Sequence, residues 1–235
     1  MKPFLTSLAL MTALAACQPE EPPQQSRAEV GAELVSQCVT SECGRLNLDR
    51  HSLANYSTLS QLTHLRALMI SYTDFADMTA IAGLTQLDEL HIGQTQVTDI
   101  SSLGRFQNLT LLHMQGLNAD DFSVLGQLRG MQELAVGQNN LTDISFVQNM
   151  PKLKSLDISF SDVKDLSPLR GHPSIEHINI DGMRDVQIGV LEHMPHLKTV
   201  TIRFLHDITP ATQAMFDRLE ARGIKVQQVA EMVVC

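Results

Sequence analysis

The chain has 235 residues, which is ample for a continuous hydrophobic core. Its 17 Lys and Arg are outnumbered by 26 Asp and Glu, which gives a formal net charge of −9. An acidic chain has no electrostatic footprint for nucleic acid, so we expect no nucleic-acid partner. It is also repelled by anionic lipid headgroups, so any attachment to a membrane needs an anchor other than a basic surface.

The start of the chain has the pattern of an export signal. One Lys precedes an apolar run that is too short to span a bilayer, and small residues follow it. The run ends in Leu-Ala-Ala-Cys at Cys17, which resembles the lipobox of bacterial lipoproteins. That resemblance implies a signal peptide over residues 1–16 and palmitate-type acyl chains on Cys17. Because Gln18 follows the Cys, it also implies an anchor in the outer membrane of the bacterial cell envelope. An ordinary signal peptide with a coincidental Cys is the alternative.

Residues 17–26 are predicted to form a disordered tether. After the Cys they contain three Pro, three Gln and no large apolar side chain. Such a segment cannot bury enough surface to offset the entropy lost on ordering. In an extended Pro-rich state it would hold the folded part up to roughly 28 Å from a membrane.

Residues 27–45 are predicted to form a helical N-terminal cap, because their apolar side chains recur at helical spacing. An exported protein permits disulfides. Cys38 and Cys43 lie together beside this cap, and a bridge that closes so small a loop would add roughly 2 kcal/mol. Eight stacked repeat units of about 4.8 Å each would place Cys235 roughly 35 Å from them, too far for a bridge. Cys235 is therefore either free or able to link two copies in a dimer.

From residue 46 to residue 208 the sequence repeats with a period of 22, without an inserted or deleted residue. This gives seven full units and one partial unit. No unit can bury its apolar edge alone, but stacked units can. The repeat is marked by the apolar pairs Leu46/Leu48, Leu68/Ile70, Leu90/Ile92, Leu112/Met114, Leu134/Val136, Leu156/Ile158, Ile178/Ile180 and Val200/Ile202.

Each unit has the spacing of a strand followed by a short helical turn. Leu90 and Ile92 are separated by one residue, which points both side chains to one face of a strand. The later apolar residues of the unit recur every three positions, which suits a short 3₁₀ or helical turn. An Asp just before this segment is placed to cap its free backbone N–H groups. The Asp residues at this position are Asp77, Asp99, Asp143 and Asp165.

The repeat is similar to the short leucine-rich repeats of bacterial internalins. The resemblance implies an α/β solenoid shaped as a curved horseshoe, with parallel strands on the concave face and short 3₁₀ or helical turns on the convex face. Internalin-type repeats carry a buried Asn in each coil, which suggests a ladder of hydrogen bonds here with smaller side chains. The matching positions hold Thr73, Thr95, Asn139 and Ser161, whereas His51, Leu117, Met183 and Leu205 depart from the pattern.

The last two units depart from the core pattern in the same way. Asp185 and Asp207 stand where Val97 stands in an earlier unit. An unpaired carboxylate inside the stack would cost several kcal/mol. We therefore expect a one-residue shift of the backbone that places Val186 and Ile208 inward and both Asp outward.

Residues 209–235 are predicted to cap the C-terminal end of the stack. Thr209 is placed as an N-cap and Pro210 as the first residue of a helix, and Gly223 ends it. The apolar residues after Gly223 predict a final strand-like segment.

The strand positions that point away from the core predict a binding surface, because solenoids commonly bind partners on the concave face. A modest apolar patch is expected near its middle, rimmed by Glu, with aromatic residues at Tyr72, Phe160 and Phe204 on the neighbouring rim. A scatter of tolerated surface residues is the alternative. The residues expected to contact a partner are Met69, Glu89, His91, Leu111, His113, Glu133, Ala135, Asp157, Phe160 and His177.

His91 and His113 occupy equivalent positions on adjacent strands, with Glu89 close by. Two imidazoles and a carboxylate are ligands that a divalent metal accepts, but the sequence supplies no clear further ligand. No motif of a nucleophile elbow, a phosphate-binding loop, a zinc protease or a dinucleotide site is present. We therefore expect no cofactor and no enzyme.

Three functions are compatible with these sequence features. The first is a membrane-anchored module that binds a protein or peptide on its concave face. The second is a structural scaffold of the envelope. The third is a metal carrier or enzyme built on His91 and His113.

Overall fold

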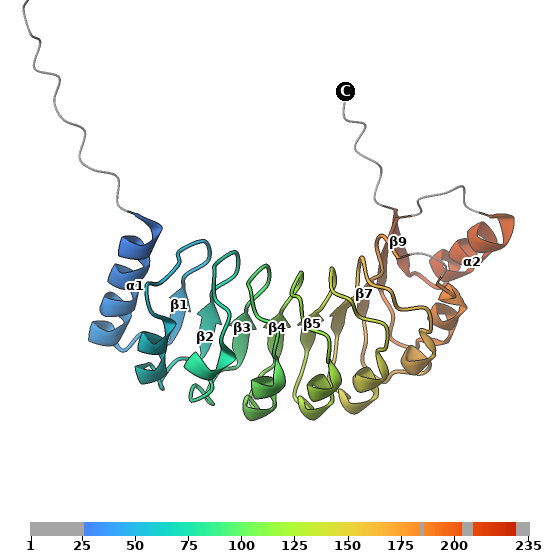
Figure 1. Ribbon diagram of the computed structural model, residues 1–235. Coiled ribbons are helices and arrows are strands. Elements are labelled where there is room, and N and C mark those ends of the chain that lie inside the picture. Colours follow the sequence, from blue (N-terminus) through green and yellow to red (C-terminus); the bar gives the residue numbers. More distant parts are fainter. Residues whose placement is uncertain (1–25, 184–185, 204–208, 229–235) are drawn as a thin grey trace, which may run out of the picture.

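Nine short parallel strands form one sheet, in which each strand pairs with its neighbours in the sequence (Figure 1). The computed structural model describes residues 26–183, 186–203 and 209–228. From β1 to β8 the pairing joins residues 22 apart, as in Leu46 with Leu68, so the sequence period is the register of the sheet. The strands are β1 (Arg45–Asn47), β2 (Ala67–Met69), β3 (Glu89–His91), β4 (Leu111–His113), β5 (Glu133–Ala135), β6 (Ser155–Asp157), β7 (His177–Asn179), β8 (Thr199–Ile202) and β9 (Lys225–Gln228).

A 3₁₀ helix follows each of the first seven strands on the opposite side of the coil. Figure 1 shows the coils stacked in a shallow arc, with the strands along the inner side and the helical turns along the outer side. The predicted solenoid is confirmed. The 3₁₀ helices are η1 (Tyr56–Gln61), η2 (Met78–Ala80), η3 (Ser101–Arg105), η4 (Ser123–Gln127), η5 (Ser145–Asn149), η6 (Ser167–Leu169) and η7 (Ile188–His193).

A carboxylate caps most of these turns, as predicted. The N–H of Ser101 donates to Asp99 Oδ1 at 2.8 Å, and the N–H of Ser167 donates to Asp165 Oδ1 at 2.7 Å. Asp77 and Asp143 cap their turns in the same way. Asp121 does so too, although it was not predicted as a cap. Each cap satisfies a backbone donor that the short helix leaves unpaired.

The core is a continuous column of apolar side chains between the sheet and the turns. In the unit that begins at Leu90, the side chains of Leu90, Ile92, Leu103 and Phe106 have no exposed surface. Burial of each contributes about 2 kcal/mol as an upper estimate. Val186, in the first of the two departing units, is half-buried and packs against the core. The backbone shift itself stays a prediction, because Asp185 lies outside the described residues.

One core position holds a histidine. His172 occupies the slot that Phe106 and Met150 fill in other coils, and only 5% of its surface is exposed. Its Nε2 lies 3.2 Å from the carbonyl oxygen of Val147, and the N–H of Ser174 lies 3.4 Å from Nδ1. Burial lowers the pKa of His172, because the charged ring would lose its hydration inside the stack.

The predicted ladder of buried hydrogen bonds is wrong for most coils. Asn139 donates to the carbonyl oxygens of Met114 and Val136 and accepts from the N–H of Leu117, so it joins two coils. The hydroxyls of Thr73 and Thr95 donate to carbonyl oxygens of their own coils, and the Ser161 hydroxyl has no partner. Side chains shorter than Asn cannot span the gap between coils.

Helix α1 (Arg27–Ser41) covers the N-terminal end of the stack, as predicted. It begins with a capping box, in which Ser26 and Glu29 each bond the other's backbone N–H. A disulfide joins Cys38 at the end of the helix to Cys43, which precedes β1. The bridge therefore ties the cap to the first coil.

Helix α2 (Pro210–Ala221) and strand β9 cover the other end (Figure 1). The hydroxyl of Thr209 accepts the N–H of Thr212, and Pro210 is the first helical residue, both as predicted. Within the described residues no helix is long and apolar enough to cross a membrane. Several predictions concern residues outside the described part, namely Cys17, Asp185, Phe204, Leu205, Asp207, Ile208 and Cys235.

Candidate functional site

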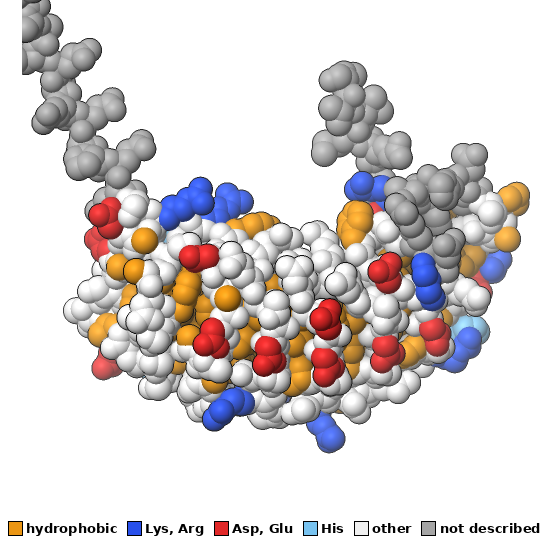
Figure 2. Space-filling view, in the orientation of Figure 1, with side chains coloured by type: hydrophobic (Ala, Val, Ile, Leu, Met, Phe, Trp, Pro, Cys, Tyr) orange, Lys and Arg blue, Asp and Glu red, His pale blue; other side chains and the backbone are white. Residues whose placement is uncertain are grey.

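The inner side of the arc is the surface of the sheet that faces away from the core. The strand residues at its two ends carry cations, Arg45 on β1 and Lys225 on β9, and the strands between them carry mostly acidic, imidazole and small polar side chains. Acidic side chains also repeat along the stack in the view of Figure 2, with few basic ones between them.

The structure corrects the expected apolar patch on this surface. Met69 is 4% exposed and Ala135 is 5% exposed, so neither offers its side chain to a partner. The register places Met69 between Asn47 and His91, whose polar side chains flank it on the neighbouring strands. Leu111 alone remains as a half-buried aliphatic side chain of the predicted patch.

An ion pair between β1 and β3 covers part of strand β2. Arg45 Nη2 donates to Glu89 Oε1 at 2.8 Å. The register puts Ala67 of β2 between the strands of these two residues, so the pair passes over it, and Ala67 is buried. Side chains that reach over a neighbouring strand make the inner surface more closed and more polar than the alternation of residues suggests.

His91 and His113 are in contact at the centre of the surface. Their ring centroids are 4.5 Å apart in an edge-to-face arrangement. His91 Nε2 lies 2.8 Å from Glu89 Oε1, and His113 Nε2 lies 2.7 Å from Glu133 Oε1. Because a carboxylate only accepts, each Nε2 carries the proton and each Nδ1 is left as an acceptor when the ring is neutral.

The pKa values of this group reflect burial and the shared hydrogen bonds. Burial, reinforced by the neighbouring His113, lowers the pKa of His91, although the hydrogen bond to Glu89 opposes that shift. Burial opposes ionisation of Glu89, but hydrogen bonds from Arg45 and His91 outweigh it and lower the pKa of that carboxyl. At neutral pH the surface therefore holds an ionised Glu89 beside a neutral His91.

Within the described residues no group of three or more His, Cys, Asp and Glu side chains is placed to hold a metal ion. Each imidazole is hydrogen-bonded to a different carboxylate, His91 to Glu89 and His113 to Glu133. The metal-carrier reading has no geometric support.

Two adjoining hollows mark the inner surface. One, of about 270 Å³, extends from Asp49 on the first coil to Asp157 on β6. The other, of about 280 Å³, extends from β4 to β8 and includes Glu133 and His177. His113, Gln115 and Asp157 line both, so the hollows form one surface that crosses most of the sheet.

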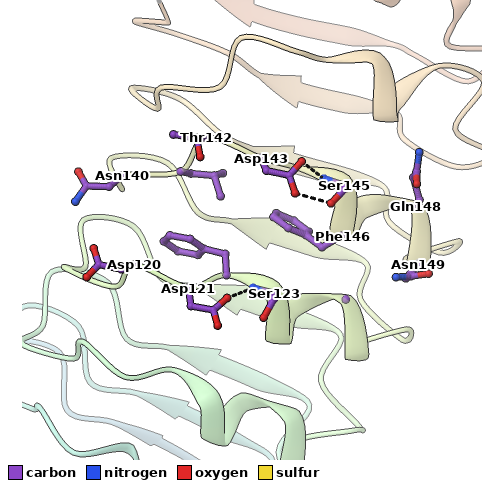
Figure 3. Close-up of a pocket in the computed structure, with 13 residues that line it drawn as sticks. Asp120, Asp121, Ser123, Asn140, Thr142, Asp143, Ser145, Phe146, Gln148 and Asn149 are labelled. Carbon is purple, nitrogen blue, oxygen red and sulfur yellow. Dashed lines mark hydrogen bonds between the residues drawn. The ribbon is translucent and has the colours of Figure 1, made fainter.

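A third hollow, of about 470 Å³, lies outside the inner surface, between η4 and η5 (Figure 3). Asp121 and Asp143 line it, but both carboxylates are engaged in capping Ser123 and Ser145, as the dashed lines show. Phe122, Leu141 and Phe146 form its apolar wall, and Asp120 and Asn140 lie among its other lining residues. Because two of its three carboxylates serve the turns, we do not assign this hollow a ligand.

The turn that follows each of the first seven strands forms a rim with left-handed backbone. Non-Gly residues rarely adopt positive φ, and for a bulky residue the conformation costs on the order of 1 kcal/mol. The turns repeat this left-handed conformation because the N–H at this position donates to the next coil. An example is the bond from the Tyr72 N–H to the carbonyl oxygen of Gly93. The described rim residues have φ between 51° and 67°, and they are Arg50, Tyr72, Gln94, Gly116, Gln138, Phe160 and Gly182.

The rim side chains lie along the stack and contact one another. The Arg50 guanidinium carbon lies 5.3 Å from the centre of the Tyr72 ring. Gln94 Nε2 donates to Gln138 Oε1 at 3.1 Å, across Gly116. Tyr72 and Phe160 remain 58% and 49% exposed, the most exposed large apolar side chains described. The sequence predicted Tyr72 and Phe160 on this rim. It did not predict the left-handed backbone there, although Gly116 and Gly182 are consistent with it.

Solved structures have the same architecture. An internalin from Listeria monocytogenes is 19% identical, with a TM-score of 0.65 over 85% of this chain and 68% of that chain. Internalin C2 from the same species is 27% identical, with a TM-score of 0.63 over 67% and 70%. A leucine-rich-repeat protein of Leptospira interrogans is 17% identical, with a TM-score of 0.63 over 75% and 45%. No protein-family model and no curated protein matches the sequence. The fold is therefore that of an internalin-like leucine-rich-repeat protein.

Proposed function

We propose that this protein is a binding module of the bacterial cell envelope that holds a partner protein or peptide on its inner surface. The observation that carries the proposal is the pair of adjoining hollows, which share His113, Gln115 and Asp157 and cross most of the sheet. A surface of this kind recognises a partner by shape and by polar complementarity. The leucine-rich-repeat fold of the neighbours supports an interaction scaffold rather than an enzyme.

The proposal includes the membrane anchor that the start of the sequence suggests. Processing before Cys17 and acylation of that residue would attach the chain to the outer membrane, with the following Pro-rich segment as a tether. The support is the lipobox-like Leu-Ala-Ala-Cys sequence. Expression of the full chain and of a Cys17→Ala variant in a Gram-negative host, with labelled palmitate, tests it: label on both chains or on neither contradicts the anchor.

The binding proposal is tested by capture of partners from envelope and host-cell extracts with three forms of the full chain. One is the native chain, and the second carries Leu111→Glu and His177→Glu on the inner surface. The third carries Gln127→Glu and Gln148→Glu on exposed positions of η4 and η5, which adds the same negative charge to the outer side. We expect a partner that the native and outer variants retain and the inner variant loses. Equal capture by all three would contradict the proposed surface.

A further inference from the structure

The hollow that runs along the rim carries amide side chains over its middle coils. Three of its lining residues are Gln94, Gln115 and Gln138, and none of the described residues that line it is Lys, Arg or aliphatic. Its two carboxylates, Asp49 and Asp157, belong to the first and the sixth coil. The hollow is therefore long and polar, with amides between two distant carboxylates.

The amides offer hydrogen-bonding groups of both kinds. Gln94 Nε2 donates to Gln138 Oε1, which leaves Gln94 Oε1 as an acceptor and the amide nitrogen of Gln138 as a donor. This bridge crosses Gly116, where a Cβ atom would collide with Gln94 Nε2. Gln115, next to Gly116 in the chain, adds a third amide. A ligand whose own groups both donate and accept matches this lining, whereas an ion matches only half of it.

An exposed aromatic ring lies on each side of the amide bridge along the rim. Tyr72 follows β2 and Phe160 follows β6, so the two residues are four strand spacings apart, roughly 19 Å. The Arg50 guanidinium lies over the Tyr72 ring, and the ring of Phe160 lies over Gly182. These contacts hold both rings in place while leaving them exposed to a ligand.

We propose that this rim row, made by Tyr72, Gln94, Gln138 and Phe160, binds a neutral glycan chain that runs along the solenoid. The inference goes beyond the proposed function, because its ligand is a saccharide and not a protein. A sugar hydroxyl both donates and accepts, as the hydroxyl of a Ser does, so it can pair with either end of an amide. The C–H face of a sugar ring is apolar and can pack against an aromatic ring.

The length of the row fits a short glycan. A sugar ring in an extended chain is about as long as one strand spacing, about 4.8 Å, so about five sugars reach from Tyr72 to Phe160. The terminal sugars would then pack on the two rings, and those between them would face the amides. An extended chain parallel to the stack meets one coil with each sugar.

The charges beside the row favour a neutral chain. Asp49 and Asp157 border the hollow in a protein of net charge −9, so a glycan that carries carboxylates or phosphates is repelled. Arg50 lies against Tyr72, so a cationic chain is repelled at that end. A neutral glycan incurs neither penalty.

The test uses the full chain and three neutral probes, namely cellohexaose, mannohexaose and the hexamer of N-acetylglucosamine. Hexamannuronate has the length of mannohexaose but carries carboxylates, and an acetylated Gly-Ser repeat peptide is the protein-like control. Binding is followed by calorimetry and by Tyr emission, which is measurable because the chain has two Tyr and no Trp.

We expect at least one neutral probe to bind with a dissociation constant below about 1 mM, and at least about tenfold more tightly than hexamannuronate or the peptide. Failure of all three neutral probes overturns the proposal. Equal binding of hexamannuronate or of the peptide also overturns it, because the site would then not select a neutral glycan.

A variant without the rings locates the contact. Tyr72→Asn/Phe160→Asn removes both rings, and Asn tolerates the positive φ of these positions, so the variant should fold. It should bind the neutral probe at least about tenfold more weakly. Val39→Ala is the matched control, because it truncates another exposed apolar side chain, on α1, and should bind as the native chain does. Equal binding by the ring variant and the native chain overturns the assigned site.

A second variant keeps the proposal testable if the ring variant does not fold. Gln94→Met/Gln138→Met keeps the side-chain length and removes the amides, and it should also weaken the neutral probe roughly tenfold. Unchanged binding by this variant overturns the role of the bridge. The inner variant Leu111→Glu/His177→Glu leaves the row intact and should still bind the glycan. Protein capture and glycan binding can therefore fail separately.

Discussion

Gly182 is required at the rim for two independent reasons. Its φ is 67°, and a Cβ atom there would lie 2.3 Å from two ring carbons of Phe160. We expect Gly182→Ala to lower the free energy of unfolding by about 1–3 kcal/mol, because the backbone becomes strained and the ring must move. Urea unfolding followed by circular dichroism measures the change.

Gly83→Ala is the matched control. Gly83 has no positive φ, and nothing lies within 4 Å of a Cβ built there. This variant should be neutral, or more stable by up to about 1 kcal/mol, because the unfolded chain loses freedom. If the two variants behaved alike, the rim would not impose the conformation described here.

His172 makes the stability of the stack depend on pH near neutrality. Burial lowers its pKa, so between the folded value and the unfolded value of about 6.5 the unfolded chain binds the extra proton. Stability from the neutral ring is complete above about pH 6.5 and is lost as the pH falls below it. We expect His172→Met, which places the residue of Met150 and Met194 in that slot, to reduce the loss of stability between about pH 7.5 and about pH 5. An unchanged difference between those pH values would show that His172 is not the group responsible.

At the scale of the element, the strands and turns could be predicted from the spacing of the apolar residues alone. Leu90 and Ile92 define the inward face of a strand, and the three-residue spacing after them defines the 3₁₀ turn, because each pattern can bury its apolar side chains in one way. The surface of the same strands was not predictable in this manner. Whether Ala67 and Met69 are exposed depends on how far the side chains of Arg45 and His91 extend over the neighbouring strand. Periodicity carries no information on that.

The capping carboxylates set the response of the turns to acid. Hydrogen bonds from the backbone N–H and the side chains of Ser101 and Ser167 lower the pKa of Asp99 and of Asp165. Their contribution to stability is present above the unfolded pKa of about 3.9 and is lost as the pH falls through the lower folded values. The double change to Ala should lower the melting temperature at neutral pH, because the turns lose their caps.

The double change of Asp99 and Asp165 to Asn separates the cap from its charge. Asn keeps the acceptor oxygen, so the melting temperature at neutral pH should stay closer to that of the native chain than with Ala. The acid-induced loss of stability should become smaller in both variants. Equal melting temperatures for the Ala and Asn forms would mean that these hydrogen bonds do not hold the turns.

At the scale of the whole molecule, the disulfide fastens α1 to the end of the stack. The bridge between Cys38 and Cys43 joins residues of sequence separation 5. By lowering the entropy of the unfolded chain, it raises the free energy of unfolding by roughly 2 kcal/mol. We expect the Cys38→Ala/Cys43→Ala variant to lose about that amount, and reduction of the native chain to have the same effect. Identical urea midpoints for native and reduced protein would exclude the bridge as a fastening.

The overall architecture was the part most open to prediction, because seven copies of one pattern reinforce a single register. The buried ladder was less predictable. Asn139 joins two coils whereas Thr73 and Thr95 do not, and the difference of one or two atoms in side-chain length decides it. The site was also predictable only in part. The repeat register predicted that His91 and His113 would be neighbours, but it did not predict the left-handed rim.

The side chains that reach over a strand have a consequence for how the stack opens. In a simple solenoid each coil contacts only its neighbours, so the ends unravel one coil at a time. Arg45 and Glu89 join the first coil to the third, and Gln94 and Gln138 join the third to the fifth, each across 44 residues. A coil held in this way cannot detach until the side-chain bond that passes over the neighbouring coil has broken. Amide protons of β1 to β5 should therefore exchange as a shared block rather than in a gradient from the end.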